Sequence, residues 1–212
     1  VEWWEVSSDS LWALLGWSLF GLQCVLALIM PSQVHRSFSA FVASLALYMA
    51  LATSAMAVVT SGLVLLAITL LWLNEFRWPG RFKDVQAWGY GLLLGLLVIQ
   101  WLAHSGQALP LLNDMTDSAW AGLTPWLSVA LLALALLLVF LSVFQRFSSS
   151  KGCWAAYPCA AALLIVTFYV PSVGQGVVVM SLGFAIGHRV LVGAGVLSLL
   201  LGVGSYYYWL ES

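Results

Sequence analysis

Two glutamines lie deep within apolar stretches of this sequence and are candidates for chemistry inside a membrane. Gln23 and Gln100 each stand among uncharged residues. An amide side chain there needs hydrogen-bond partners from the protein, because hydrocarbon supplies none. Such an amide either joins two helices or lines a substrate site. Joining is the more common role, and we expect each glutamine to face a neighbouring helix.

Two histidines each precede an arginine, in His35-Arg36 and His188-Arg189. Both pairs are expected at cytoplasmic ends of helices, where they would contact lipid headgroups or a cytoplasmic anion. Ligation of a metal or haem is the competing interpretation, but a bis-histidine haem in a bilayer usually needs histidines within the spans. We therefore predict no metal site and no cofactor.

Catalytic motifs are absent from the sequence. It contains no GxSxG, no HExxH and no paired-carboxylate arrangement, so hydrolase chemistry has no visible machinery. No Asp, Glu, Lys or Arg stands near the middle of an apolar stretch. Charged residues at membrane depth usually mark ion pathways and proton relays. We therefore expect neither an enzyme nor a proton pump.

Small residues recur at helical spacing in two places, Gly91-x-x-x-Gly95 and Gly183-x-x-x-Gly187. In membrane helices this spacing creates a face along which two helices approach closely. We expect these glycines to serve helix packing.

The elements that carry these residues must be membrane helices. Hydrophobic residues make up 63% of the 212 residues and charged residues 7%, against roughly 25% charged in a soluble domain. The net charge of −1 offers no field that would attract nucleic acid. We predict an all-α bundle of about eight transmembrane spans forming one membrane domain over residues 1–212, with approximate spans 10–30, 37–54, 56–74, 85–104, 125–145, 154–170, 173–187 and 189–209.

Two breaks divide apolar runs that are too long for one span. Phe38 to Leu73 is a run of 36 uncharged residues, which as one helix would be about 54 Å long, so a corner is expected at Thr53-Ser54. Pro171 begins a similar break, because proline lacks a backbone donor. The segment 173–187 is short, and a re-entrant arm is the alternative to a span.

Charge sets the predicted orientation. With eight spans, all seven Lys and Arg residues fall in the odd-numbered connections, and both ends of the chain carry acidic residues instead. Since Lys and Arg concentrate in short cytoplasmic loops, both termini are predicted on the non-cytoplasmic side.

The last 30 or so residues carry a recognisable pattern. A GF-x-x-G-[NH]-R-x-L turn covers Gly183 to Leu191, and a closing S-x-YY segment covers Ser205 to Tyr208. This pattern resembles an uncharacterised family of bacterial polytopic membrane proteins, a domain of unknown function often encoded beside a protein with a GDYxxLxY motif. The resemblance implies a bacterial inner membrane and a membrane-associated partner, but no activity. It also implies a further segment after the tyrosines, so the chain is expected to continue.

Three functions are compatible with these features. The leading hypothesis is a non-catalytic accessory or scaffold subunit of a membrane complex, with the lipid bilayer and another membrane protein as partners. The alternative is a transporter or channel for a small neutral or lipid-like solute, since broken helices often build sites near the midplane. An intramembrane enzyme is the third.

Overall fold

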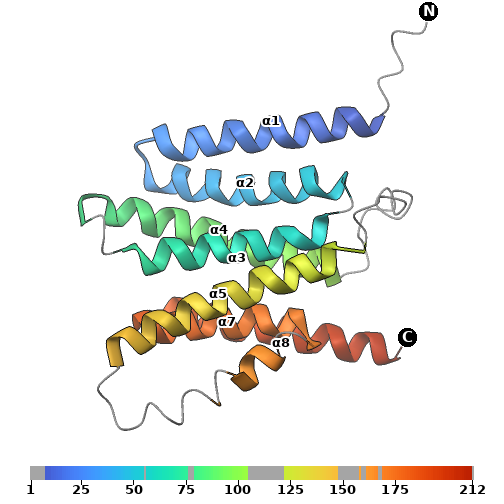
Figure 1. The fold of residues 1–212 in the computed structure, drawn as a ribbon. Coiled ribbons are helices and arrows are strands. Elements are labelled where there is room, and N and C mark those ends of the chain that lie inside the picture. Colours follow the sequence, from blue (N-terminus) through green and yellow to red (C-terminus); the bar gives the residue numbers. More distant parts are fainter. Residues whose placement is uncertain are drawn as a thin grey trace, which may run out of the picture.

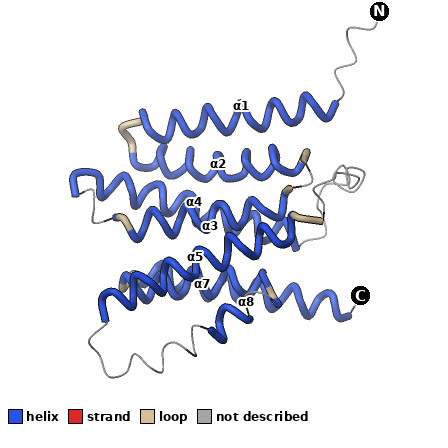
Figure 2. The backbone as a smooth tube through the Cα atoms, viewed as in Figure 1, coloured by secondary structure: helices blue, strands red, loops and turns tan. Residues whose placement is uncertain are grey.

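The computed structural model is helical throughout the part of the chain that it describes (Figures 1 and 2). That part comprises residues 8–54, 56–75, 79–104, 122–147, 158, 161–166 and 169–211, and it contains no strand. The predicted all-α fold is confirmed there. The elements are α1 (Ser8–Ile29), α2 (Gln33–Ala52), α3 (Ala57–Leu73), the short 3-10 helix η2 (Pro79–Arg81), α4 (Phe82–His104), α5 (Thr124–Phe147), α7 (Pro171–Ile186) and α8 (Arg189–Glu211).

The helices form an elongated stack in which consecutive long helices run in opposite directions (Figure 1). Helix α1 lies at one edge against α2, and α2 packs on α4 and α3. Helix α3 also contacts α5 and α7, while α7 and α8 form a pair at the other edge. The start of α1 and the end of α8 lie at the same end of the stack (Figure 1).

Helix α3 is the central element of the bundle. It has neighbours on several sides, namely α2, α4, α5 and α7. Its sequence AVVTSGLVLLAITLLWL is uncharged and largely apolar all round, which is the pattern of a core helix or a membrane span, and Val58, Leu63 and Leu70 remain exposed on its outer side. Its side chains Leu65, Ile68 and Trp72 are fully buried. These residues form the middle of the core, together with Leu96 of α4 and Leu136 of α5.

Local signals in the sequence explain where the helices end. The corner expected at Thr53-Ser54 follows α2, and the Thr53 hydroxyl donates to the Ala50 carbonyl at 2.7 Å. Pro171 starts α7, where its missing N–H needs no partner. Gly187 ends α7 with a φ of 78°, a left-handed conformation that glycine adopts without steric cost.

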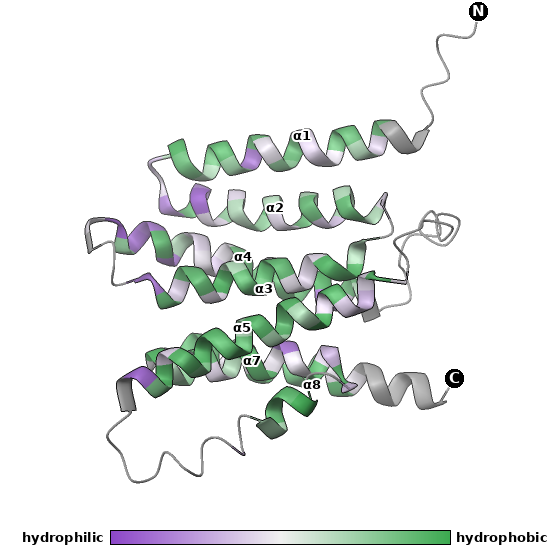
Figure 3. Ribbon diagram, in the orientation of Figure 1, coloured by the Kyte–Doolittle hydropathy of each residue, from purple (hydrophilic) through white to green (hydrophobic). Residues whose placement is uncertain are grey.

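Four helical stretches are long and apolar enough to cross a membrane: Leu11–Ile29, Gln33–Ala52, Phe82–Ala103 and Thr124–Gln145. Three apolar stretches are shorter: Ala57–Leu73, Pro171–Ile186 and Arg189–Gly204. Of the predicted span 154–170, residues 154–157, 159–160 and 167–168 lie outside the described residues, and 161–166 are helical. Hydrophobic residues dominate every helix, and hydrophilic ones gather mainly at one end of the stack (Figure 3).

Candidate functional site

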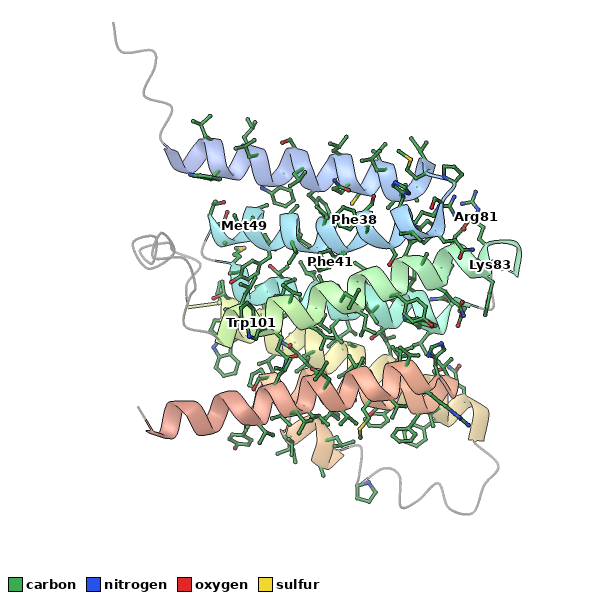
Figure 4. All side chains as sticks on the ribbon, turned by 180° about the vertical axis from the view of Figure 1, so that it is seen from behind. Phe38, Phe41, Met49, Arg81, Lys83 and Trp101 are labelled. Carbon is green, nitrogen blue, oxygen red and sulfur yellow. The ribbon has the colours of Figure 1, made fainter. Side chains whose placement is uncertain are left out.

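The hydrophilic end of the bundle gathers the basic side chains of the described residues. Arg36 lies in the first turn of α2, Arg81 and Lys83 lie where α4 begins, and Arg189 starts α8. Figure 4 shows Arg81 and Lys83 at this end, with Met49 and Trp101 at the opposite one. Arg36 forms an ion pair with Asp84 and also donates from Nε to the Met30 carbonyl at 2.5 Å. We call this part of the molecule the basic end.

Just beneath the basic end, three aromatic rings from separate elements meet. Trp72 comes from the last turn of α3, Tyr90 from α4, and His188 from the turn between α7 and α8. The Trp72 ring centroid lies 5.6 Å from that of Tyr90 and 5.0 Å from that of His188. The Tyr90 hydroxyl and His188 Nε2 are 3.0 Å apart and share a hydrogen bond. These contacts connect α3, α4 and the α7–α8 turn.

Glu75 joins this group just beyond the end of α3. Its side chain is 2% exposed, although carboxylates are almost never fully buried unless they are paired. Burial raises the pKa of the Glu75 carboxyl above its ordinary value, while a hydrogen bond from Gln86 and the charge of His188 act in the opposite direction. Desolvation is the largest of these effects, and it acts by penalising the charged carboxylate. We call Glu75, Trp72, Tyr90, His188 and Gln86 the carboxyl–histidine cluster.

Two glycines allow the cluster to form. Gly89 lies against the Trp72 indole, and a Cβ at position 89 would come within 2.6 Å of Trp72 Nε1. Gly187 turns the chain between α7 and α8, and the His188 amide then donates to the Gly183 carbonyl at 2.8 Å. That turn directs the chain back, so that the imidazole reaches Tyr90 on α4.

The chemistry open to this cluster is the binding of protons. Three of its buried polar atoms, Glu75 Oε1, Trp72 Nε1 and His188 Nδ1, have no hydrogen-bond partner within the described part of the chain. A carboxyl, an imidazole and a phenol together offer several places for one proton. The described residues contain no group of three or more His, Cys, Asp or Glu that could hold a metal. Glu75 and His188 alone fall short of the three or four protein ligands of a zinc site.

A second set of buried polar groups lies on the far side of the core. Gln100 Nε2 donates to the Ser172 carbonyl at 3.2 Å and to the Ser198 carbonyl at 3.0 Å, and the Ser198 hydroxyl donates to Gln100 Oε1 at 2.6 Å. Gln175 donates to the Ser61 hydroxyl at 2.9 Å. These bonds join α4 to α7 and α8, and α7 to α3.

The other residues singled out in the sequence lie in contrasting places. Gln23 is half-buried on α1. His35 and Arg189 are exposed at the basic end, whereas Arg36 and His188 are engaged with Asp84 and Tyr90. The two His-Arg pairs therefore have different surroundings: the arginine is engaged in one and the histidine in the other.

The four glycines singled out in the sequence also differ. Gly91 faces the Ser37 carbonyl of α2, Gly95 faces the Ser44 hydroxyl of α2, and Gly183 faces Val192 of α8. The absence of a side chain lets the helices approach closely at these positions. Gly187 has open space around it, and its part is to end α7.

Sequence reasoning missed Glu75, Tyr90 and Gln175 as candidates. The signal for Glu75 was its place directly after an apolar helix, in Trp72-Leu73-Asn74-Glu75. A carboxylate so close to a membrane helix is costly and therefore informative. Gln175 stands just after Pro171, in a segment whose proline and glycines predict only a break between helices. Nothing in the sequence distinguishes Tyr90 from a tyrosine at the membrane interface.

Comparison with known proteins gives a family but no function. A family model described as "Domain of unknown function (DUF4401)" matches residues 6–212. No curated protein and no solved structure matches the chain.

Replacement of Glu75 by glutamine should remove a pH dependence of stability. The pKa of Glu75 is raised in the folded protein. Burial of this side chain therefore reduces the free energy of unfolding least at pH values below its ordinary pKa of 4.5. Stability is then lost as the pH rises through the folded value. Thermal unfolding in detergent between pH 4.5 and 8 should show the wild type losing stability relative to Glu75→Gln. Arg81→Gln, which changes an exposed charge, should keep the wild-type profile, and identical profiles for wild type and Glu75→Gln would contradict the assignment.

Proposed function

The chain belongs to the DUF4401 family, a domain of unknown function, and we propose that it is a multi-pass membrane protein that serves as a non-catalytic accessory or scaffold subunit. The observation that carries this proposal is a contrast within the bundle. Its deepest amides are bonded between helices, while α1 packs mainly on α2 and presents a long apolar surface on its other sides.

The proposed membrane location is supported by the exposed side chains. Helices α1 and α5 expose many large apolar residues, although they are the two most hydrophobic of the long helices. In water, each such side chain would forgo about 1.5–3 kcal/mol of burial free energy. In lipid, the same surface is solvated. The exposed residues of these helices are Leu11, Trp12, Leu14, Leu15, Trp17, Leu19, Leu22, Val25, Leu28, Ile29, Trp126, Leu127, Leu134, Leu137 and Leu141.

We propose eight spans, counting 154–170, with the basic end in the cytoplasm of a bacterial cell and the protein in its inner membrane. The gathering of Arg36, Arg81, Lys83 and Arg189 at one end of the stack supports this orientation, because Lys and Arg concentrate in cytoplasmic loops. The arrangement supports cytoplasmic turns at Pro31, Gly80 and Gly187, and a turn at Ser54 on the opposite side.

Helix α1 is the proposed docking element for the partner subunit. It packs on α2, and Trp88 of α4 donates a hydrogen bond to its Ala27 carbonyl at 2.8 Å. Between α1 and α2 lies an apolar groove of about 670 Å³, lined by Trp12, Leu15, Leu19, Leu22, Leu45, Met49 and their neighbours. Such a groove accepts the apolar side chains of another helix.

The transporter hypothesis competes for the same polar residues. A substrate pathway needs amides that are free to bind a solute, whereas Gln100 uses both its nitrogen and its oxygen within the bundle. This geometry supports the joining role.

Replacing Gln100 with leucine separates these two roles. If Gln100 joins helices, its replacement should lower the free energy of unfolding by about 1–3 kcal/mol, because the Ser198 hydroxyl loses its acceptor. Thermal unfolding in detergent should show this loss. Gln23→Leu, a matched change on the edge helix α1, should have a much smaller effect. Unchanged stability of Gln100→Leu would contradict the joining role and favour a pathway.

Native mass spectrometry after gentle extraction from the source membrane tests the subunit proposal. We expect a stoichiometric partner mass on the wild type. Leu19→Trp should fill the α1–α2 groove and deplete the partner, whereas Leu14→Trp, on the same helix but outside the groove, should retain it. A lone chain carrying a small bound molecule would contradict the subunit role.

Cysteine labelling in intact cells tests the orientation. In a background with Cys24, Cys153 and Cys159 replaced by alanine, Ser54→Cys should react with an impermeant maleimide from outside. Lys83→Cys should react only after permeabilisation. The reverse pattern would overturn the proposed orientation.

A further inference from the structure

A second groove lies between α2 and α4 and opens on the side of the bundle. It has a volume of about 620 Å³, within the range of roughly 300–1,000 Å³ that is typical of small-molecule sites. Figure 4 shows three of its lining residues, Phe38 and Phe41 on α2 and Lys83 at the start of α4. Its lining is Gln33, Val34, Ser37, Phe38, Phe41, Lys83, Gln86, Ala87, Tyr90, Leu94 and Val98.

The groove changes in polarity along its length. Gln33, Lys83 and Gln86 line its mouth at the basic end, whereas Phe41, Leu94 and Val98 line its inner part. Along α4, Lys83 and Val98 are separated by about 22 Å at 1.5 Å per residue. One leaflet of a bilayer, including its headgroups, is about 20–22 Å thick. The groove therefore extends through about one leaflet, with its polar mouth at headgroup depth.

The charges at the mouth favour an anion. Lys83 is exposed and has no ion-pair partner within the described residues, because the neighbouring carboxylate of Asp84 is paired with Arg36. Helix α2 begins at Gln33 in the mouth, and the Ser32 side chain does not cap it. A helix start carries a partial positive charge and free amide donors, which suit a phosphate oxygen.

We propose that this groove binds one anionic glycerophospholipid of the cytoplasmic leaflet. The phosphate would lie between Lys83 and the start of α2, and one acyl chain would run along Phe38, Phe41 and Leu94. A partner helix would cover the apolar part but leave the ammonium at the mouth without a counter-charge, and a lipid satisfies both parts. The inference rests on the membrane location proposed above, and not on the existence of a partner subunit.

The groove also adjoins the carboxyl–histidine cluster. Tyr90 and Gln86 line the groove and are, at the same time, the partners of His188 and Glu75. A bound acyl chain would therefore cover the lateral side of the cluster.

Lipid titration by native mass spectrometry tests the proposal. The delipidated full-length chain is titrated in detergent with phosphatidylglycerol or with phosphatidylcholine of the same acyl chains. We expect the first phosphatidylglycerol to bind several-fold more tightly. Lys83→Gln should weaken this first binding about fivefold and remove most of the preference, since one cation near a membrane surface contributes on that scale. Arg81→Gln, a neighbouring exposed cation outside the groove lining, should leave it unchanged.

Occupation of the groove itself is tested by filling it. Leu94→Trp should abolish the first tight binding of phosphatidylglycerol. The Leu94 side chain is 55% exposed, so the fold tolerates a larger side chain at this position. Leu137→Trp, a matched change on the surface of α5, should not. Circular dichroism and size-exclusion chromatography verify that each variant is folded.

Three results of these lipid titrations would overturn the proposal. They are equal affinity for both lipids, tight binding that survives Leu94→Trp, and competition by inorganic phosphate without any effect of the acyl chain. Extraction of the wild type by carbonate without detergent would instead contradict the membrane location, so the two failures are distinguishable. A partner protein that crosslinks through position 94 in place of lipid would also overturn the proposal.

Discussion

The short central helix is the constraint on which the rest of the structure depends. Helix α3 has 17 residues and is about 26 Å long, shorter than α4 with 23 residues and α5 with 24. Its last turn consequently ends inside the bundle, where α4 and the α7–α8 turn cover it. Trp72 and Glu75 are buried for that reason, and the carboxyl–histidine cluster follows from a difference of a few residues in helix length.

The same constraint explains how polar groups are distributed. Where no water is available, an amide or hydroxyl must bond to another part of the protein. Gln100 meets this requirement with both its nitrogen and its oxygen, and Gln175 meets it with its nitrogen, so that both hold α7 and α8 against the rest of the bundle. Glu75 and Gln175 each keep one side-chain oxygen without a partner among the described residues. The joining amides act as structure, while the carboxyl remains a group whose charge can change.

The sequence was sufficient to predict the long helices that the structure describes, but not the cluster. Hydropathy, Thr53-Ser54 and Pro171 are local signals, and each predicted the end or the start of a helix that the structure contains. The burial of Glu75 depends on the approach of α4 and His188, which are distant in the chain. The dipeptides at 35–36 and 188–189 are the same in sequence, yet His35 is exposed and His188 contacts Tyr90. The turn at Gly187 and the position of Tyr90 on α4 make this difference, and a dipeptide pattern contains no information on the packing around it.

Helix α4 contributes residues both to the carboxyl–histidine cluster and to the groove between α2 and α4. One side of it bears Gly91 and Gly95, which admit α2 closely, and the groove between the two helices is lined by other residues of both. Tyr90 precedes this glycine face and reaches both the groove and His188. Tyr90 is thus common to the lining of the groove and to the carboxyl–histidine cluster. The basic end is therefore the part of the molecule where the groove proposed for a lipid adjoins the buried carboxyl.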